Sequence, residues 1–187
     1  MRAQKRFDIT RLQVGDELPS LAKPPIDRVQ IARCAGALND FNPMNLDDAC
    51  AQAEGMPSAF VSPQIPMVFA GQLAQQWFAG GQLRRLAVRF LKLVWPGDAL
   101  TFHGRLLRCE LSDAGEATVE VDLWGENQDG EVILKGICVG VLDTARRRDP
   151  QHRRRADTDA SADAGGEVGG EGGGGEAAVE DATRAPS

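Results

Sequence analysis

The residues with the clearest chemical potential lie in one short stretch, residues 36–49, which reads GALNDFNPMNLDDA. It contains a carboxylate at Asp40, an Asn-Pro pair at Asn42 and Pro43, and an amide at Asn45, five residues after the carboxylate. A carboxylate can act as a general base, whereas an amide has no pKa near neutrality and can only hold a water molecule. The stretch therefore predicts an active-site loop with an amide where proton-transfer chemistry would use a histidine.

A second group of candidate residues opens the longest predicted helix, over residues 62–79. Ser62 carries a hydroxyl that can either cap this helix or donate to a substrate oxygen, and Pro63 fits the first helical position. Of the two roles for Ser62, the sequence favours the cap. Apolar residues then cover most of the circumference of the helix, which is typical of a helix buried on all sides.

Two shorter helices flank the polar loop in the sequence. Asp27 can cap a helix over residues 28–38, whose apolar positions recur at helical spacing. Asp47 can cap a second helix over residues 48–54, which Gly55 would end. The polar loop is thus the connection between two predicted helices.

The remaining elements are predicted strands. Residues 9–18 predict a short strand with a Val-Gly-Asp turn, and the pattern after residue 82 is that of strands. Four antiparallel strands are expected over residues 84–95, 99–111, 116–127 and 131–143. Gly136, Cys138 and Gly140 share one face of the last strand, where small residues would let a helix lie close. One apolar helix with an antiparallel sheet to wrap it predicts an α+β fold.

The composition limits the class of protein. The chain has 187 residues and a net charge of −6, so its charge indicates no nucleic-acid partner. Its four cysteines form no C-x-x-C pair and it has two histidines, which argues against a zinc site. There is no apolar leader, and no apolar run approaches the roughly 18 residues of a membrane span. By default we expect a cytoplasmic protein with reduced thiols and no membrane contact.

The composition changes abruptly near residue 144. Residues 145–155 contain six arginines, and residues 156–187 are rich in Gly, Ala and acidic residues and lack aromatic side chains. Such a segment cannot bury enough apolar surface to offset its ordering entropy. We therefore predict one folded domain over residues 1–144 and a disordered, solvated tail over residues 145–187.

Four stretches, in this order, resemble a known family: VGDELP, GALNDFNPMNLD, AFVSPQIPM and LAVRFLKLVWPGDALTFHGRL. They are similar to MaoC-like hot-dog proteins, which include (R)-specific enoyl-CoA hydratases and 3-hydroxyacyl-thioester dehydratases, and the resemblance covers residues 9–143. It implies a curved antiparallel sheet around a central helix over residues 64–78, usually in dimers whose sheets join edge to edge. The small hot-dog subunits of the heteromeric hydratases of steroid side-chain breakdown look similar too.

The resemblance also implies a chemistry, in which water is added to an acyl thioester or removed from it. In the family an Asp and a His five residues apart orient the water and shuttle protons, and a backbone N–H at the start of the central helix polarises the thioester carbonyl. Asp40 falls on that Asp, but Asn45 falls on the His. Pro63, which has no N–H, falls on a Gly, and Ser62 falls where the family often has a second His.

The resemblance therefore implies roles for individual residues. We expect Asp40 to act as the base, Asn45 to position water, and Ser62 or a backbone amide to polarise the carbonyl. The residues expected to contact substrate are Asn42, Pro43, Gln64, Arg84 and Arg89. The two arginines, with Arg85 and Lys92, would meet CoA phosphates, although a solvated strand face explains them equally well.

Other residues of chemical interest have simpler structural explanations. His103 lies in a predicted strand far along the chain from the polar loop, and we expect it to be an exposed strand residue rather than the missing base. Cys34 and Cys138 are expected to be small buried residues. No cofactor and no metal site is expected.

Two functions of different class remain open. The first is a hydro-lyase, a dehydratase or enoyl-thioester hydratase of lipid or steroid acyl metabolism with a degenerate site. The second is a non-catalytic hot-dog subunit that pairs with a catalytic MaoC-like partner. A weaker third is a hot-dog thioesterase using Asp40. The expected partners are an acyl-CoA or acyl-carrier-protein thioester and a second hot-dog subunit, in a homodimer or a heterodimer.

Overall fold

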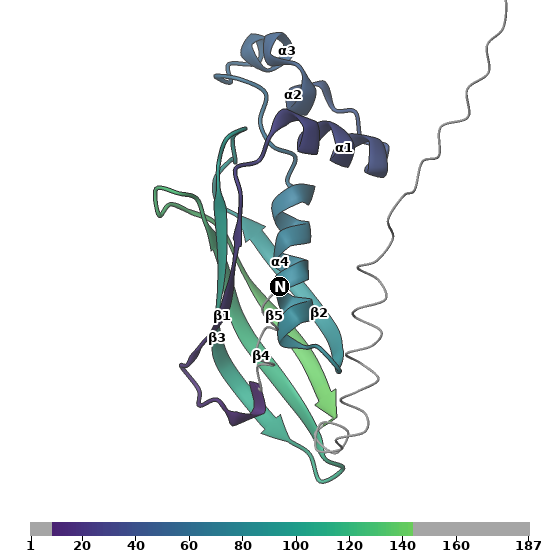
Figure 1. Cartoon of the computed structure of the whole chain (residues 1–187), viewed down its shortest axis with the longest axis vertical. Coiled ribbons are helices and arrows are strands. Elements are labelled where there is room, and N and C mark those ends of the chain that lie inside the picture. The colour runs from purple at the N-terminus through teal and green to yellow at the C-terminus, as the bar shows by residue number, and fades with distance from the viewer. Residues whose placement is uncertain (1–8, 144–187) are drawn as a thin grey trace, which may run out of the picture.

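A computed structural model describes residues 9–143, so the tail predicted over residues 145–187 lies outside the described residues. One long helix lies along a curved sheet, and three shorter helices gather beyond one end of it (Figure 1). The elements in chain order are η1 (Ile9–Arg11), β1 (Glu17–Lys23), α1 (Arg28–Leu38), α2 (Pro43–Leu46), α3 (Asp48–Ala53), α4 (Gln64–Trp77), β2 (Gln82–Phe90), β3 (Leu100–Leu111), β4 (Glu116–Glu126) and β5 (Val132–Asp143).

The described strands form one antiparallel sheet in the order β1-β3-β4-β5-β2. β3, β4 and β5 follow one another in the chain, and their connecting turns contain Gly115 and Gly130, whose φ angles of 80° and 74° favour glycine. β1 and β2 are the two edges of the sheet. The predicted α+β fold, a curved antiparallel sheet around one apolar helix, is confirmed.

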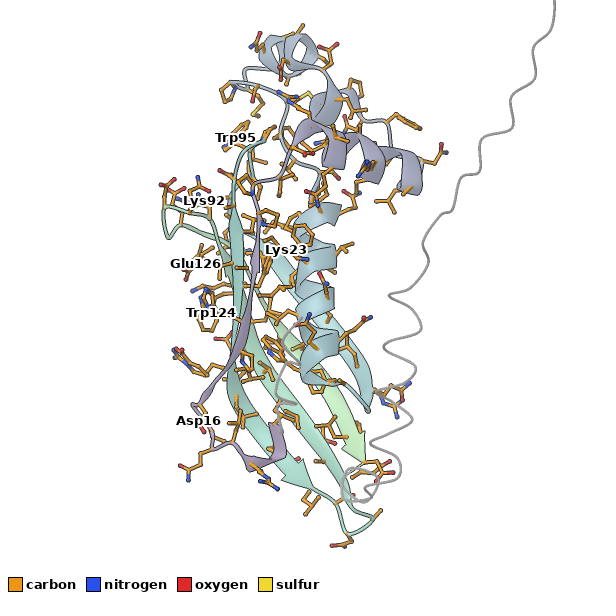
Figure 2. All side chains as sticks on the ribbon, in the orientation of Figure 1. Asp16, Lys23, Lys92, Trp95, Trp124 and Glu126 are labelled. Carbon is orange, nitrogen blue, oxygen red and sulfur yellow. The ribbon has the colours of Figure 1, made fainter. Side chains whose placement is uncertain are left out.

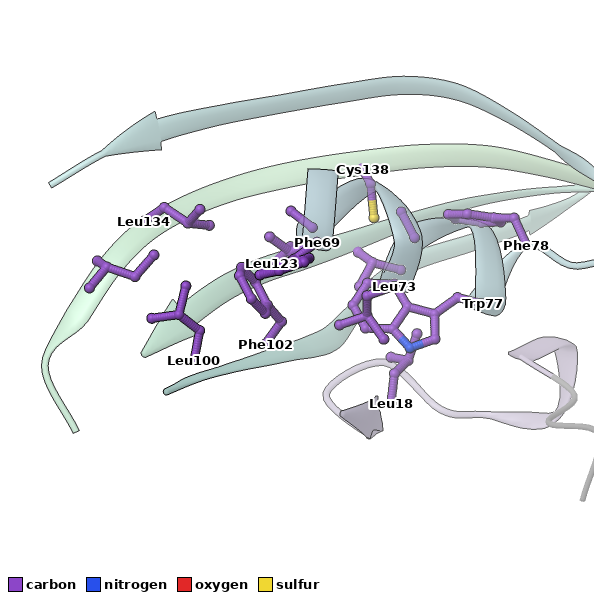
Figure 3. Packing of buried hydrophobic residues seen from close by; sticks show 14 of the residues in the cluster. Leu18, Phe69, Leu73, Trp77, Phe78, Leu100, Phe102, Leu123, Leu134 and Cys138 are labelled. Atoms are coloured by element: carbon purple, nitrogen blue, oxygen red, sulfur yellow. The ribbon is translucent and has the colours of Figure 1, made fainter. Parts of the chain in front are cut away.

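The core lies between α4 and the concave face of the sheet (Figure 3). The buried residues of α4 are Ile65, Pro66, Phe69, Ala70, Leu73, Ala74 and Trp77. Phe69 meets the ring of Phe102 on β3 edge to face, with ring centroids 6.1 Å apart. Because most of the circumference of α4 is apolar, the sheet can curve around it and bury it on several sides.

Glycines let the C-terminal half of α4 approach the sheet closely. A Cβ placed on Gly104 of β3 would lie 2.3 Å from the ring of Trp77, and one on Gly140 of β5 would lie 2.3 Å from the ring of Phe78. The expected close approach at the last strand is therefore confirmed at Gly140. Trp77 also donates its indole N–H to the Pro19 carbonyl at 2.8 Å, which ties α4 to β1.

The predicted strand over residues 9–18 is largely wrong. Residues 9–11 form a turn of 3-10 helix with Ile9 fully buried, and β1 starts only after the turn at Gly15. The Gly15 N–H donates to the Leu106 carbonyl at 2.8 Å, which brings the chain onto β3. The Val-Gly-Asp turn is thus the entrance to an edge strand.

The strand predicted over residues 84–95 is too long, because β2 ends at Phe90. Val94 is buried, and its carbonyl accepts from the Val61 N–H at 2.8 Å. This bond draws the chain away from the sheet toward the segment that leads into α4. Burial of one side chain and one tertiary hydrogen bond therefore override the strand propensity of the stretch.

The three short helices form a unit beyond the N-terminal end of α4 (Figure 1). As predicted, Asp27 caps α1 by accepting from the Gln30 N–H at 2.6 Å, and Asp47 caps α3. The Arg28 guanidinium makes two bonds of 2.7 and 3.0 Å to Asp48, which join α1 to α3 and help to lower the pKa of that carboxyl below its ordinary value. The polar loop is held within this unit.

Candidate active site

Asp40 is positioned by the way α1 ends. Asn39 adopts the left-handed conformation with a φ of 51°, and the Asp40 N–H donates back to the Ala35 carbonyl at 3.0 Å. This is the bonding of a Schellman-type helix end, and Asn tolerates the left-handed conformation better than most residues other than Gly. The backbone of Asp40 is therefore fixed, and its side chain is half-buried.

Asn45 lies in α2 and is only 6% exposed. Its Nδ2 donates to the Phe60 carbonyl at 2.9 Å, and the Phe60 N–H donates to the Met44 carbonyl at 3.2 Å. Together these bonds join α2 to the segment that leads into α4. Asn45 Oδ1 has no hydrogen-bond partner among the described residues, so it can still accept from a water molecule.

Gln64, the first residue of α4, connects Ser62 to Asp40. Its Nε2 donates to Asp40 Oδ2 at 3.1 Å, and its Oε1 accepts from the Ser62 hydroxyl. The predicted helix cap at Ser62 is wrong, because Pro63 is the N-cap of α4 and makes no side-chain cap bond. The Ser62 hydroxyl is turned to the Gln64 side chain instead, so a row of polar side chains runs from the start of α4 to the polar loop.

The first turn of α4 is poor in backbone donors. Pro63 and Pro66 have no N–H, and the Ile65 N–H donates to the Ser62 carbonyl at 3.1 Å. Among the described residues the Gln64 N–H has no acceptor, as expected for the first helical residue. This N–H is therefore the donor that the start of α4 offers to a ligand, one residue after the proline.

Asp40, Asn45 and Ser62 line one small recess at the N-terminal end of α4. The opposite wall comes from one face of α1, at Ile31, Cys34, Ala35 and Leu38. The space between these side chains holds about one water molecule. Burial and then the Asp40 charge raise the pKa of the Cys34 thiol, so this thiol stays protonated as part of the wall. Asp40 is the one carboxylate lining the recess in the described part of the chain.

None of the five residues expected to contact substrate lines this recess, although Gln64 bonds to Asp40, which does. Asn42 caps α2 by accepting from the Met44 N–H at 3.0 Å, and Pro43 is the exposed first residue of that helix. Arg84 and Arg89 are exposed on β2, whose first residues follow the C-terminal end of α4. At 1.5 Å per residue, the length of α4 separates Arg84 from the recess by roughly 20 Å. Within one chain, neither arginine joins Asp40, Asn45 and Ser62 in the lining of the recess.

His103 is on the face of the sheet turned away from α4. Its ring stacks on Trp124 with centroids 5.2 Å apart, and its Nε2 lies 4.0 Å from Glu126. Figure 2 shows Trp124 and Glu126 on this outer face. The expectation that His103 is a surface strand residue and not the missing base agrees with this placement, although the stack leaves it only partly exposed.

Two features of the site were missed by the sequence analysis. The left-handed conformation of Asn39 could have been anticipated from the sequence, since Asn directly after a helix is one of the residues that adopt this conformation at helix ends. The apolar wall also had a signal, because its four residues are spaced three and four apart along α1. Nothing local indicated that this face of α1 would point at Asp40 and Asn45.

Among residues 9–143, no group of three or more His, Cys, Asp or Glu side chains is arranged to hold a metal ion. In the same residues, no helix is both long enough and apolar enough to cross a membrane. The recess itself offers one carboxylate and one amide oxygen around a water-sized space, and the free backbone N–H of Gln64 lies at the start of α4, two residues after Ser62.

The fold and this recess define a hot-dog protein with a candidate site at the start of its central helix. Residues 11–125 match the family described as MaoC like domain, and the chain belongs to that family of dehydratases and hydratases. The elements from β1 to β3, the Asp40 loop and the segment before α4 lie within the matched residues, whereas β5 lies beyond them. None of the curated proteins matches the chain.

Solved structures show the same fold. An (R)-hydratase from A. caviae involved in PHA biosynthesis is 26% identical, with a TM-score of 0.58 over 71% of this chain and 98% of that chain. A MaoC-like dehydratase from Rhodospirillum rubrum is 21% identical, with a TM-score of 0.63 over 73% and 96%. A chain of the ChsH1-ChsH2 complex from Mycobacterium tuberculosis is 22% identical, with a TM-score of 0.57 over 70% and 98%.

Proposed function

We propose that this protein is a hydro-lyase that adds water to an enoyl thioester or removes it from a 3-hydroxyacyl thioester, with Asp40 as the proton-transfer group. The observation that carries the proposal is the placement of Asp40, Asn45 and Ser62 around one water-sized recess at the start of α4. A carboxylate within hydrogen-bond reach of a water molecule can act as the general base of such a reaction.

In the hydration direction, the Gln64 N–H donates to the thioester carbonyl and withdraws electron density from the conjugated Cβ. Asp40 and the Oδ1 of Asn45 hold the water. Asp40 takes one proton as the water oxygen bonds to Cβ, and the same proton then passes to Cα. The elements of one water molecule are thereby added across the double bond with Asp40 returned to its starting state.

The site predicts a slow reaction in the isolated chain. Asn45 cannot share the proton transfers, and removing one general acid or base typically lowers a rate by about 10²–10⁴. The Ser62 hydroxyl is occupied by Gln64, so of the two donors expected, Ser62 or a backbone amide, the Gln64 backbone N–H is the one left to polarise the carbonyl. The substrate proposed is an acyl-CoA or acyl-carrier-protein thioester of lipid or steroid acyl metabolism.

A second candidate function is that of a non-catalytic subunit. The observation in its favour is the bond from Asn45 to the Phe60 carbonyl, which gives Asn45 a structural task. In this case a MaoC-like partner with an intact Asp/His loop would perform the reaction. Of the structures compared, one is itself named as a complex of two proteins, ChsH1 and ChsH2.

A partner subunit is proposed under either function, and the edge strand β2 is the place for it. β2 pairs with β5 on one side only within the described chain. Directly at its end, Phe90, Leu91 and Leu93 are 42%, 47% and 44% exposed. An unpaired strand edge next to large exposed apolar side chains is suited to edge-to-edge pairing with a second hot-dog sheet.

The proposal is tested by measuring hydration of crotonyl-CoA and of a longer enoyl-CoA by the purified chain. The reaction is monitored through the loss of absorbance of the conjugated thioester. Wild-type activity that Asp40→Ala abolishes supports the hydro-lyase, and Asn45→His should then raise the rate. Activity that appears only when a MaoC-like partner is added supports the second function. Release of free CoA thiol instead of hydration would identify a thioesterase and contradict both.

A further inference from the structure

Gln64 is the residue through which the start of α4 reaches the Asp40 carboxylate. It is the first residue of the helix and is partly buried, between the segment that carries Ser62 and the loop that carries Asp40. Asp40 lies 24 positions earlier in the chain, so the bond between the two side chains is a tertiary contact and not a local one.

The orientation of the Gln64 amide follows from what its two neighbours can do. An ionised carboxylate only accepts hydrogen bonds, so the NH₂ end must face Asp40 Oδ2, which lies 3.1 Å away. The carbonyl end then faces Ser62, whose hydroxyl is able to donate to it. Turning the amide over would lose the bond to Asp40, because oxygen would then face oxygen.

This bond holds one oxygen of Asp40 and leaves the other available. Apart from Gln64, no described residue bonds to the Asp40 carboxylate, while the backbone of Asp40 is fixed by its bond to Ala35. A proton acceptor works only when it is aligned with the water that it deprotonates, and small misplacements lower rates strongly. The carboxylate is thus secured at Oδ2, and its Oδ1 is left to accept the proton.

We propose that Gln64 is a positioning residue for Asp40, and that Ser62 fixes the Gln64 amide in the orientation that this requires. The inference rests on the proposed hydro-lyase function. Since Asn45 is occupied with the Phe60 carbonyl, the group that orients Asp40 comes from the central helix and not from the polar loop.

Steady-state kinetics with three variants test the inference. Gln64→Met keeps the length of the side chain and removes both hydrogen bonds, so kcat for crotonyl-CoA should fall by about 10- to 100-fold with KM changed by less than about threefold. Ser62→Ala should lower kcat less and in the same direction. Gln75→Met, in the exposed part of the same helix, is the matched control and should leave kcat unchanged.

A double-mutant cycle separates positioning from a general structural role. In an Asp40→Ala background, Gln64→Met should lower the residual activity no further, because the group that Gln64 orients is gone. If Gln64→Met lowers activity equally in both backgrounds, or if kcat of the single variant equals that of the wild type, the inference is wrong.

Nuclear magnetic resonance gives a readout that does not depend on activity. The side-chain NH₂ resonances of Gln64, assigned by their loss in Gln64→Met, should shift in Asp40→Ala and in Ser62→Ala, while those of Gln75 stay unchanged. An inactive wild type that shows these shifts would contradict the proposed function and keep the contact. Gln64 resonances insensitive to Asp40→Ala would overturn the inference even in an active enzyme.

Discussion

Asn45 makes a hydrogen bond that needs a donor but no titratable proton. A neutral imidazole also carries one N–H donor, so a His at this position has the chemistry to bond the Phe60 carbonyl as Asn45 does. The amide therefore keeps α2 tied to the segment before α4 while lacking the proton transfer that an imidazole adds. At this residue, the structural hydrogen bond to the Phe60 carbonyl can therefore be kept without the capacity for proton transfer.

Removing the Asn45 side chain should destabilise the protein. Asn45→Ala leaves the Phe60 carbonyl without its donor next to a small cavity, and we expect the free energy of unfolding to fall by about 1–3 kcal/mol. Urea unfolding followed by tryptophan fluorescence measures this. Asn45→His should lose less, since it keeps a donor, and a loss for Asn45→Ala of under about 0.5 kcal/mol would contradict a structural role.

Cys138 predicts how stability changes at alkaline pH. Burial, with a smaller contribution from the Asp122 charge, raises the pKa of this thiol from 9.0 to about 12. In the unfolded chain the thiol ionises near pH 9, so the unfolded state binds fewer protons than the folded state between about pH 9 and 12. The stabilisation that Cys138 contributes is complete below pH 9 and is lost as the pH rises toward 12.

Unfolding measurements from pH 8 to 11 check this. Wild-type stability should decline above pH 9, and Cys138→Ala should start less stable and decline less steeply. Parallel slopes for the two proteins would show that Cys138 is not the group responsible. Native Cys138 should also resist alkylation by iodoacetamide at pH 8, because the thiolate is the reactive form.

At the scale of elements, α4 depends on a close approach to β3. A Cβ on Gly104 would lie 2.3 Å from the Trp77 ring, so Gly104→Ala must displace the ring or the strand. We expect a loss of about 1–3 kcal/mol in the free energy of unfolding, by overpacking. Gly36 in α1 has open space around its Cβ position and is the matched control.

Gly36→Ala should stabilise the protein by about 0.5–1 kcal/mol, since Ala favours a helix over Gly. Thermal unfolding of both variants measures the contrast, with Tm expected to fall for Gly104→Ala and to rise for Gly36→Ala. A Gly104→Ala protein as stable as the wild type would mean that the Trp77 ring does not rest on Gly104.

Proline at position 63 removes a backbone donor from the start of α4 and restricts the backbone there. Pro63 has no N–H, and Pro63→Gly would restore one at the position where the resemblance places the carbonyl-polarising N–H. Because a Gly adds conformational freedom to the unfolded chain, we expect a cost of about 0.4–1 kcal/mol in stability. Hydration of crotonyl-CoA should rise by about tenfold or more, since an added oxyanion donor is worth up to about 10²–10³.

The pair Pro63→Gly and Pro63→Ala distinguishes the cause. Both variants restore the N–H, but Ala restricts the backbone more than Gly does. Similar gains in rate with different losses of Tm would support the donor. A gain seen with Gly alone would assign the effect to flexibility and contradict the donor explanation.

At the scale of the whole molecule, β2 combines an edge that is unpaired within the described chain with exposed apolar side chains directly after it. Replacing Leu91 and Leu93 by Glu should place two charges on the proposed contact and lower the molar mass measured by light scattering. The variant should keep its circular dichroism spectrum, because both side chains are exposed in the single chain. Burying these charges without partners in the contact would cost several kcal/mol, which favours dissociation.

Leu111→Glu is the control for this experiment, since Leu111 is 68% exposed at the end of β3 and distant in sequence from β2. It should leave the molar mass unchanged. If the wild type is already monomeric alone, the same variants are tested for loss of binding to a MaoC-like partner. Equal behaviour of Leu111→Glu and the double variant would contradict the placement of the contact at β2.

Much of this molecule follows from short-range patterns in the amino-acid sequence. The caps at Asp27 and Asp47, the alternating strands after residue 99 and the apolar circumference of α4 depend on short-range spacing, and each was predicted within a few residues. The polar loop, with Asp40 and Asn45 five residues apart, was recognisable for the same reason. Capping hydrogen bonds and periodic burial depend on residues that are close together in the sequence, so they can be predicted from it.

The hydrogen bonds between the side chains of the site depend on the packing of elements that are distant in the chain. The turn of the Ser62 hydroxyl to Gln64, the Gln64 bond to Asp40 and the Asn45 bond to the Phe60 carbonyl join residues whose meeting depends on how α1, α2 and α4 pack. β2 ended early for a similar reason, at a contact between Val94 and Val61. A side chain with several possible partners takes the one that packing brings within reach, and spacing along the chain does not reveal which one that is.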